Sequence, residues 1–203
     1  MSAPVFLLAT NNAGKIAEMR PIFASLGLKC VSMREAGVVS DPEETGKTFL
    51  ENALIKARSA MEASGMPAVA DDSGLMVDAL DGAPGVMSAR FAGSHDATDA
   101  EKCAYLLAKM EDKEQRSARF VSYIACVFPD GGEVAADGEC EGEIIRAPRG
   151  ESGFGYDPVF VPEGFGETFA ELGPEIKNGI SHRARALRAF KEELARYLGR
   201  QSC

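Results

Sequence analysis

Near the amino end of the chain, the pattern of hydrophobic and polar residues changes from one typical of a strand to one typical of a helix. The apolar run 5–9 (VFLLA) is followed by the polar stretch 10–15 (TNNAGK) and then by a helical stripe. The stripe consists of Ile16, Met19, Ile22, Phe23 and Leu26. This pattern predicts a strand, a polar loop and a helix that ends at Gly27, with a kink at Pro21 because proline lacks a backbone N–H.

Three later segments carry helix signals. Thr48 with Glu51, and Thr98 with Glu101, both fit a capping box, and the first segment ends at Gly65. The apolar stripes are Leu50, Leu54, Ala57 and Met61 in the first segment and Leu106, Leu107 and Met110 in the second. A last helix is predicted from about Ser181, and its stripe is Ala184, Leu187, Phe190, Leu194 and Leu198.

The middle of the chain has a strand pattern instead. Residues 119–128 are rich in β-forming side chains, the turn sequence PDGG follows at 129–132, and residues 133–145 form a returning strand pattern. These segments predict a hairpin with long arms. Together with the alternating elements at the amino end, the hairpin indicates an α/β protein with a mixed sheet.

Composition supports a globular protein and limits its ligands. The chain has 203 residues, 45% hydrophobic and 26% charged, which is enough for a full core in one domain. Its 22 Lys and Arg against 31 Asp and Glu give a formal net charge of -9, which argues against a nucleic-acid partner. A small phosphorylated ligand would therefore need a local basic pocket.

The cysteines, histidines and apolar runs argue against zinc-binding, disulfide-rich and membrane-spanning proteins. The 5 cysteines include no C-x-x-C pair and only 2 histidines occur, so neither a zinc site nor a disulfide framework is expected. No run reaches the roughly 18 apolar residues of a membrane span, and the chain does not begin with a signal-peptide pattern. We therefore expect reduced thiols, a cytoplasmic location and no membrane partner.

The polar stretch 10–15 is the first candidate for ligand binding. Small residues at a helix start leave backbone N–H groups beside the positive end of the helix dipole, and Lys15 adds a full charge. The stretch matches neither a Walker A loop nor the G-x-G-x-x-G pattern. It is either a phosphate cradle or an ordinary Asn-capped turn.

Two adjacent carboxylates form the second candidate. The apolar residues 68–70 run directly into 71–74 (DDSG), and Glu43 and Glu44 lie upstream. Adjacent strand residues point to opposite faces, so one Asp can face a ligand at the strand end, where α/β folds bind ligands. Carboxylates near phosphate call for a hard cation such as Mg²⁺, which indicates magnesium and a phosphorylated substrate. Alternatively, these Asp residues cap a turn and the Glu pair is solvated.

The third candidate is an aromatic residue between glycines in the segment 153–158 (GFGYDP). The ring of Phe154 could stack on a purine, while Asp157 accepts a hydrogen bond and Lys177 donates one. The pair 182–183 (HR) adds further donors. In the alternative interpretation, the aromatic residues belong to the core and the pair is a solvated helix end.

Taken together, these motifs resemble those of the inosine triphosphate pyrophosphatase family of non-standard purine nucleoside triphosphatases. They occur in family order from about Val5 to the last helix. The matching segments are 10–15 (TNNAGK) with Glu18, 43–46 (EETG), 49–53 (FLENA) with Lys56 and Ala57, 70–75 (ADDSGL), 82–85 (GAPG) with 88–90 (SAR), 154–158 (FGYDP), and Lys177 with 181–183 (SHR). Several separated motifs in order are more specific than any one alone.

The resemblance implies a fold and an assembly. The expected fold is α/β, with an elongated mixed β-sheet flanked by helices. Residues 1–203 would form a single domain with two lobes and the active site in the cleft between them. Family members are commonly homodimers, and the segment 82–92, which includes Pro84, Val86, Met87 and Phe91, offers an apolar patch.

The resemblance also implies an activity and its residues. The reaction is hydrolysis of ITP, dITP or XTP to the monophosphate and pyrophosphate with Mg²⁺, with Asp72 as general base. Asp72 shares the metal with Glu44, and Glu43 is the alternative ligand. The residues expected to hold the triphosphate are Thr10, Asn11, Asn12, Ala13, Gly14, Lys15, Lys56 and Ser73. Those expected around base and sugar are Phe154, Gly155, Tyr156, Asp157, Lys177, His182 and Arg183.

Other functions stay open beside this one. A non-catalytic purine nucleotide sensor would not need Asp72 and Glu44, whereas a pyrophosphatase for modified pyrimidine triphosphates would share the fold and the metal chemistry. A phosphohydrolase with an aspartyl-phosphate intermediate would need an acid partner two residues after its nucleophile, a spacing that residues 71–74 lack.

Overall fold

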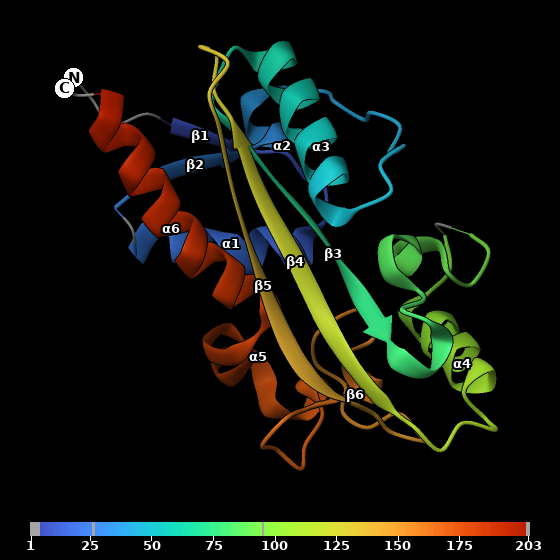
Figure 1. Ribbon diagram of the computed structural model, residues 1–203. Coiled ribbons are helices and arrows are strands. Elements are labelled where there is room, and N and C mark those ends of the chain that lie inside the picture. Colours follow the sequence, from blue (N-terminus) through green and yellow to red (C-terminus); the bar gives the residue numbers. More distant parts are fainter. Residues whose placement is uncertain (1–4, 26, 95, 202–203) are drawn as a thin grey trace. The chain divides into compact units, whose positions relative to one another are not determined.

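The strands of the computed structural model, which describes residues 5–25, 27–94 and 96–201, form one six-stranded sheet (Figure 1). Its order is β2-β1-β3-β4-β5-β6. The strands are β1 Val5–Leu8, β2 Lys29–Ser32, β3 Ala68–Val77, β4 Ser117–Val127, β5 Glu133–Ile144 and β6 Phe160–Pro162. Since β1 pairs in parallel with β2 and β3 while β5 pairs antiparallel with β6, the predicted mixed sheet is confirmed.

The helices begin largely where the capping signals place them. They are α1 Ala13–Ser25, α2 Met33–Ala36, α3 Phe49–Ser64, α4 Asp99–Lys109, α5 Phe169–Ile180 and α6 His182–Gln201. The predicted capping boxes at Thr48 and Thr98 begin α3 and α4. Two further boxes, at Ser32 and Thr168, begin α2 and α5 and had no predicted counterpart.

The chain divides into two compact units. Unit 1 comprises Met1–Asp72, Ser122–Gly138 and Arg183–Cys203, and unit 2 comprises Ser73–Val121 and Glu139–His182. None of the helices in the described part of the chain is long and apolar enough to cross a membrane.

In unit 1, helices cover both faces of the strands. Helices α1 and α6 pack on one face of β1 and α3 packs on the other, because successive residues of β1 point to opposite sides. The first face buries Phe6, Leu8, Met19, Phe23, Leu187 and Phe190, and the second buries Leu7, Ala57, Ala60 and Ala70. The predicted stripe of α6 is thus confirmed. Leu26 of the predicted first stripe lies outside the described residues.

Unit 2 has a core of its own. Helix α4 contributes Cys103 and Leu106, and three phenylalanines from β4, β6 and α5 form an aromatic group. The ring centroids of Phe120 and Phe160 lie 4.8 Å apart, and those of Phe160 and Phe169 lie 5.3 Å apart. Such contacts add stability beyond the area that the rings bury.

Two predicted boundaries need correction. The strand that was predicted to end at Asp71 and Asp72 continues to Val77 as β3, so both carboxylates lie within the strand and not at its end. The two carboxylates can lie inside the strand because cationic and hydroxyl side chains pair with them. This pairing offsets most of the free-energy cost of burying their charge. Helix α1 begins at Ala13, inside the stretch 10–15 that was predicted to be a loop, and it includes Pro21 as predicted.

Candidate active site

The loop between β1 and α1 caps its own helix. The Asn12 side chain accepts a hydrogen bond from the backbone N–H of Lys15 at 3.1 Å, and Thr10 accepts one from the N–H of Asn12 at 3.1 Å. The Asn-capped turn is therefore present. Because a helix start leaves its first amides without an acceptor inside the helix, the N–H groups of Ala13 and Gly14 still suit an anion.

Asp71 is the buried centre of a charged network in unit 1. Its carboxylate lies 2.6 Å from the Lys15 ammonium and 3.2 Å from the Arg183 guanidinium, and it accepts the Ser122 hydroxyl at 2.5 Å. Arg183 also pairs with Glu18. Burial by itself raises the pKa of the Asp71 carboxyl, but Arg183 and Lys15 hold that pKa well below its usual value. Asp71 is therefore an ionised anchor for two cations.

Lys15 is held by Asp71 through two contacts. Its ammonium pairs with the carboxylate and also donates to the Asp71 carbonyl at 3.2 Å. Burial lowers the pKa of Lys15, and the attraction of Asp71 offsets this only in part. The lysine of the polar loop is thus fixed in place by a strand far away in sequence.

Asp72 has a different partner, Lys56 of α3. The Lys56 ammonium lies 2.6 Å from the Asp72 carboxylate, 3.2 Å from the Glu44 carboxylate and 3.0 Å from the Asp71 carbonyl. Burial raises the pKa of Asp72, and the charge of Lys56 opposes that rise. A carboxylate whose pKa lies above its ordinary value is a better proton acceptor, which suits a general base.

Helix α3 also fixes the segment that carries Glu44. Buried Asn52, one turn before Lys56, accepts the N–H of Gly46 at 2.8 Å. A Cβ atom at Gly46 would lie 2.5 Å from the Asn52 side-chain oxygen, so glycine is required for this approach. Glu43 is exposed, and Glu44 is the member of the pair that Lys56 joins to Asp72.

The Asp72 and Glu44 carboxylates fit a magnesium ion, because their oxygens converge on a single cationic group, the Lys56 ammonium. Mg²⁺ is commonly bound by one or two carboxylates together with water and phosphate oxygens. Within residues 5–25, 27–94 and 96–201, no set of three or more His, Cys, Asp or Glu side chains is placed to hold a metal ion. A metal at these two carboxylates would therefore depend on substrate oxygens.

A second cluster lies in unit 2 around Asp157. One oxygen of its buried carboxylate receives the Lys177 ammonium at 2.6 Å and the backbone N–H of Phe154 at 2.9 Å. The Lys177 ammonium lies 4.6 Å from the centre of the Phe154 ring, within the range of a cation–π contact. A Cβ atom at Gly153 would lie 2.1 Å from the Asp157 carboxylate, so the close turn requires glycine.

Helix α4 fixes the same loop through residues that the sequence did not single out. Asp99 accepts the N–H of Gly155 at 2.7 Å, and the Cys103 thiol lies 3.4 Å from the Gly155 carbonyl oxygen. Asp99 and Cys103 are four positions apart, so they lie on one face of the helix. No local motif marks this contact, because it joins positions far apart in sequence.

The predicted site residues divide between the two units. Unit 1 contains Thr10, Asn11, Asn12, Ala13, Gly14, Lys15, Glu44, Lys56, Asp72 and Arg183, and unit 2 contains Ser73, Phe154, Gly155, Tyr156, Asp157, Lys177 and His182. Tyr156 is buried and its hydroxyl donates to the Ser88 carbonyl at 2.9 Å, as expected for a core aromatic residue. His182 stacks on Phe120 with ring centroids 4.8 Å apart.

Arg183 lies in the charged network of unit 1. The boundary between the units falls within the predicted pair 182–183, since His182 ends a segment of unit 2 and Arg183 begins a segment of unit 1. Arg183 is buried and its ion pairs with Asp71 and Glu18 place it in the charged network. Asp71, Glu18 and Ser122 complete that network, although the predicted site residues did not include them.

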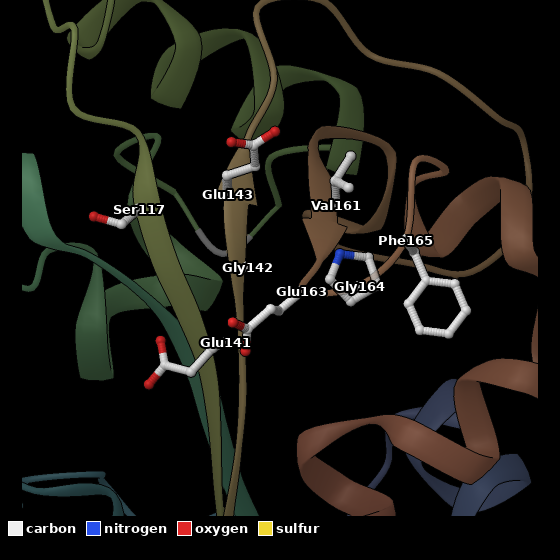
Figure 2. Close-up of a pocket in the computed structure, with 9 residues that line it drawn as sticks. Ser117, Glu141, Gly142, Glu143, Val161, Glu163, Gly164 and Phe165 are labelled. Atoms are coloured by element: carbon white, nitrogen blue, oxygen red, sulfur yellow. The ribbon is translucent and has the colours of Figure 1, made fainter.

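A hollow of about 480 Å³ in unit 2 lies apart from the predicted residues (Figure 2). Its lining comes from β4, β5, β6 and the segment after β6, and consists of Ser117, Glu141, Gly142, Glu143, Val161, Pro162, Glu163, Gly164 and Phe165. The three glutamates disfavour a phosphorylated ligand by like-charge repulsion. This hollow is therefore no candidate for the phosphate site.

The fold defines the class: an α/β protein with a mixed sheet, whose unit 1 carries a network of paired charges around Asp71 and Asp72. Comparison with known proteins agrees, since the model of the Ham1 family matches residues 6–193. The chain belongs to the Ham1 family.

Several relatives and solved structures match nearly the whole chain. The dITP/XTP pyrophosphatase of Streptomyces coelicolor is 49% identical and the match covers 95% of this chain and 98% of the relative. The dITP/XTP pyrophosphatase of Thermus thermophilus is 51% identical over 92% of this chain and 89% of the relative. A HAM1 protein from Coxiella burnetii has a solved structure with a TM-score of 0.86 and 45% identity, covering 95% of this chain and 99% of that one.

Asp71→Asn is expected to destabilise unit 1. Removing the charge leaves the buried Arg183 and Lys15 without their shared partner, a loss that costs about 3–5 kcal/mol at pH 7. Because the pKa of Asp71 is lowered by folding, its contribution is present above about pH 4, the pKa of an unfolded Asp, and is lost as the pH falls through the lower folded value.

Urea unfolding at pH 7, 5 and 3 measures this effect. The difference in unfolding free energy between wild type and Asp71→Asn should shrink toward the lowest pH. Asp137→Asn, at an exposed position of β5, serves as the control and should stay within about 0.5 kcal/mol of wild type. A constant difference at all three pH values would contradict the assigned ionisation.

Proposed function

We propose that this protein hydrolyses the non-standard purine nucleoside triphosphates ITP, dITP and XTP to the monophosphate and pyrophosphate with Mg²⁺. The observation that carries the proposal is a half-buried network in which Lys56 pairs with Asp72 and Glu44 while Lys15 pairs with the neighbouring Asp71. Two lysines suit a polyphosphate and two carboxylates suit its metal ion. The names of the relatives support the substrate class.

In this proposal, Asp72 is the general base that accepts a proton from the attacking water. The proton transfer leaves hydroxide to attack the α phosphorus, and pyrophosphate departs as the leaving group. Lys15 and the amides of Ala13 and Gly14 stabilise the negative charge that develops on phosphoryl oxygens. When bound by Asp72 and Glu44, magnesium neutralises phosphate charge and orients the reacting groups. Asp71, which also pairs with Arg183, keeps Lys15 in place.

The cluster around Asp157 is proposed to bind the base. The Phe154 ring offers a stacking surface, and the Lys177 ammonium beside it is a hydrogen-bond donor. A 6-oxo purine presents an acceptor at the position where adenine presents an amine. Donors aimed at that position leave the adenine amine unpaired and desolvated, which costs about 1–3 kcal/mol per group.

The first test compares nucleotides in one assay of the purified protein with magnesium. Pyrophosphate release is expected with ITP, dITP and XTP. The rate with ATP is expected to be at least about 10-fold lower, because binding ATP leaves one amine unpaired. GTP is measured in parallel. Orthophosphate as the product would move cleavage to the terminal phosphate, and inactivity on all purines would favour a sensor or a pyrimidine-directed enzyme.

The roles of the carboxylates are tested by three conservative variants. Asp72→Asn should lower kcat by at least about 100-fold because the amide cannot accept the proton of water. Glu44→Gln should raise the Mg²⁺ concentration needed for half-maximal rate, whereas Glu43→Gln, at the exposed neighbour, should resemble wild type. Near wild-type turnover by Asp72→Asn would remove the assigned base, and reversed effects at the two glutamates would assign the metal to Glu43.

We further propose a homodimer in a reducing, cytoplasmic setting. Met87 is 44% exposed within the segment 82–92, and Phe91 packs edge-on against Tyr105, which is 38% exposed. These side chains form an apolar surface suited to a second copy of the chain.

The cysteines at positions 30, 103, 126 and 140 are free, which supports a reducing setting. Sedimentation at micromolar concentration should give the mass of a dimer, with Met87→Glu shifting it toward a monomer; a wild-type monomer would refute the assembly.

A further inference from the structure

The Lys56 ammonium has its hydrogen-bonding capacity filled by the protein itself. An ammonium group has three N–H donors, and Lys56 has three acceptors within reach. These are the Asp72 carboxylate at 2.6 Å, the Asp71 carbonyl at 3.0 Å and the Glu44 carboxylate at 3.2 Å. A phosphate oxygen can therefore gain a hydrogen bond from Lys56 only if one of these acceptors gives it up.

The two carboxylates that Lys56 joins are the pair that fits the metal ion. Both send an oxygen to the same cation, so the ammonium neutralises their mutual repulsion. The Lys56 side chain is only 16% exposed, which limits screening by water. A divalent cation that uses these oxygens must compete with an ammonium that is already held at close range.

The backbone around the site holds both carboxylates in place, so Lys56 is the group that must move when a metal ion binds. Asn52, one turn earlier, holds Gly46 and with it the segment that carries Glu44. Asp72 is fixed within β3. Since both carboxylates are positioned from the backbone, the flexible Lys56 side chain is the part that can move away.

Resting on the proposed function, we infer that Lys56 occupies the cation position between Asp72 and Glu44 and competes with the metal ion for these carboxylates. The ammonium moves to the substrate phosphates when the metal takes its place. Metal and nucleotide then bind as a coupled pair, because phosphate oxygens replace the charged acceptors that the displaced lysine gives up. The free protein should accordingly bind divalent cations weakly.

Titration with Mn²⁺ in the absence of nucleotide tests the inference, using the electron paramagnetic resonance signal of the free ion. Mn²⁺ shares the preference of Mg²⁺ for oxygen ligands. Lys56→Met should bind Mn²⁺ at least about 10-fold more tightly than wild type. The double variant Lys56→Met/Asp72→Asn should lose this gain, which locates the bound ion.

Lys15→Met is the matched control for the lost charge. It removes one positive charge from the same network, but Lys15 contacts Asp71 and leaves the bridge between Asp72 and Glu44 intact. Its gain in Mn²⁺ affinity should stay below about 3-fold. Equal affinities of the two methionine variants would overturn the inference, since the effect would then be general electrostatics.

Two measurements keep the result unambiguous. Thermal unfolding checks that each variant is folded, and Lys56→Gln, which retains a donor for the Asp71 carbonyl, replaces Lys56→Met if the methionine variant does not fold. Pyrophosphate release by wild type is measured separately with ITP. Active wild type without the expected Mn²⁺ effect refutes the competition alone, whereas inactive wild type refutes the proposed function.

Discussion

The packing of several elements of unit 1 depends on the ionised Asp71 carboxylate. It sits inside β3 and makes contacts with Lys15 of α1, Ser122 of β4 and Arg183 of α6, so one buried side chain ties four elements together. A carboxylate without such partners would be neutralised or expelled from the interior. The network therefore explains both why β3 can continue through two acidic residues and why Lys15 is held against it.

Strand geometry assigns different tasks to Asp71 and Asp72. Successive side chains on a strand point to opposite faces, so Asp71 reaches Arg183 and Lys15 while Asp72 reaches Lys56. The first carboxylate is fully buried by its cations, whereas the second keeps 10% of its side chain exposed. An identical residue type thus serves as a fixed anchor at one position and as a group that can meet water at the next.

The sequence predicted the elements whose signals are local. The capping boxes at Thr48 and Thr98, the stripe of α6 and the turn after β4 were all confirmed because each depends on neighbours in the chain. Strands β2 and β6 are 4 and 3 residues long, too short for a periodic pattern. The end of β3 was misplaced, and the partners Ser122 and Asp99 were missed, because their contacts with Asp71 and Gly155 join distant segments.

Charge balance gives a physical reason for the metal ion in the proposed function. Within the described ion pairs, Lys15, Lys56 and Arg183 face the carboxylates of Glu18, Glu44, Asp71 and Asp72, so these paired groups hold one more negative charge than positive charges. A triphosphate would be repelled by that excess, and the whole chain at -9 adds to the repulsion. A divalent cation reverses the sign of the network. Within these described ion pairs, each of the three cations already faces at least one carboxylate of the protein, so in the proposed function the metal ion supplies the charge that receives the phosphates.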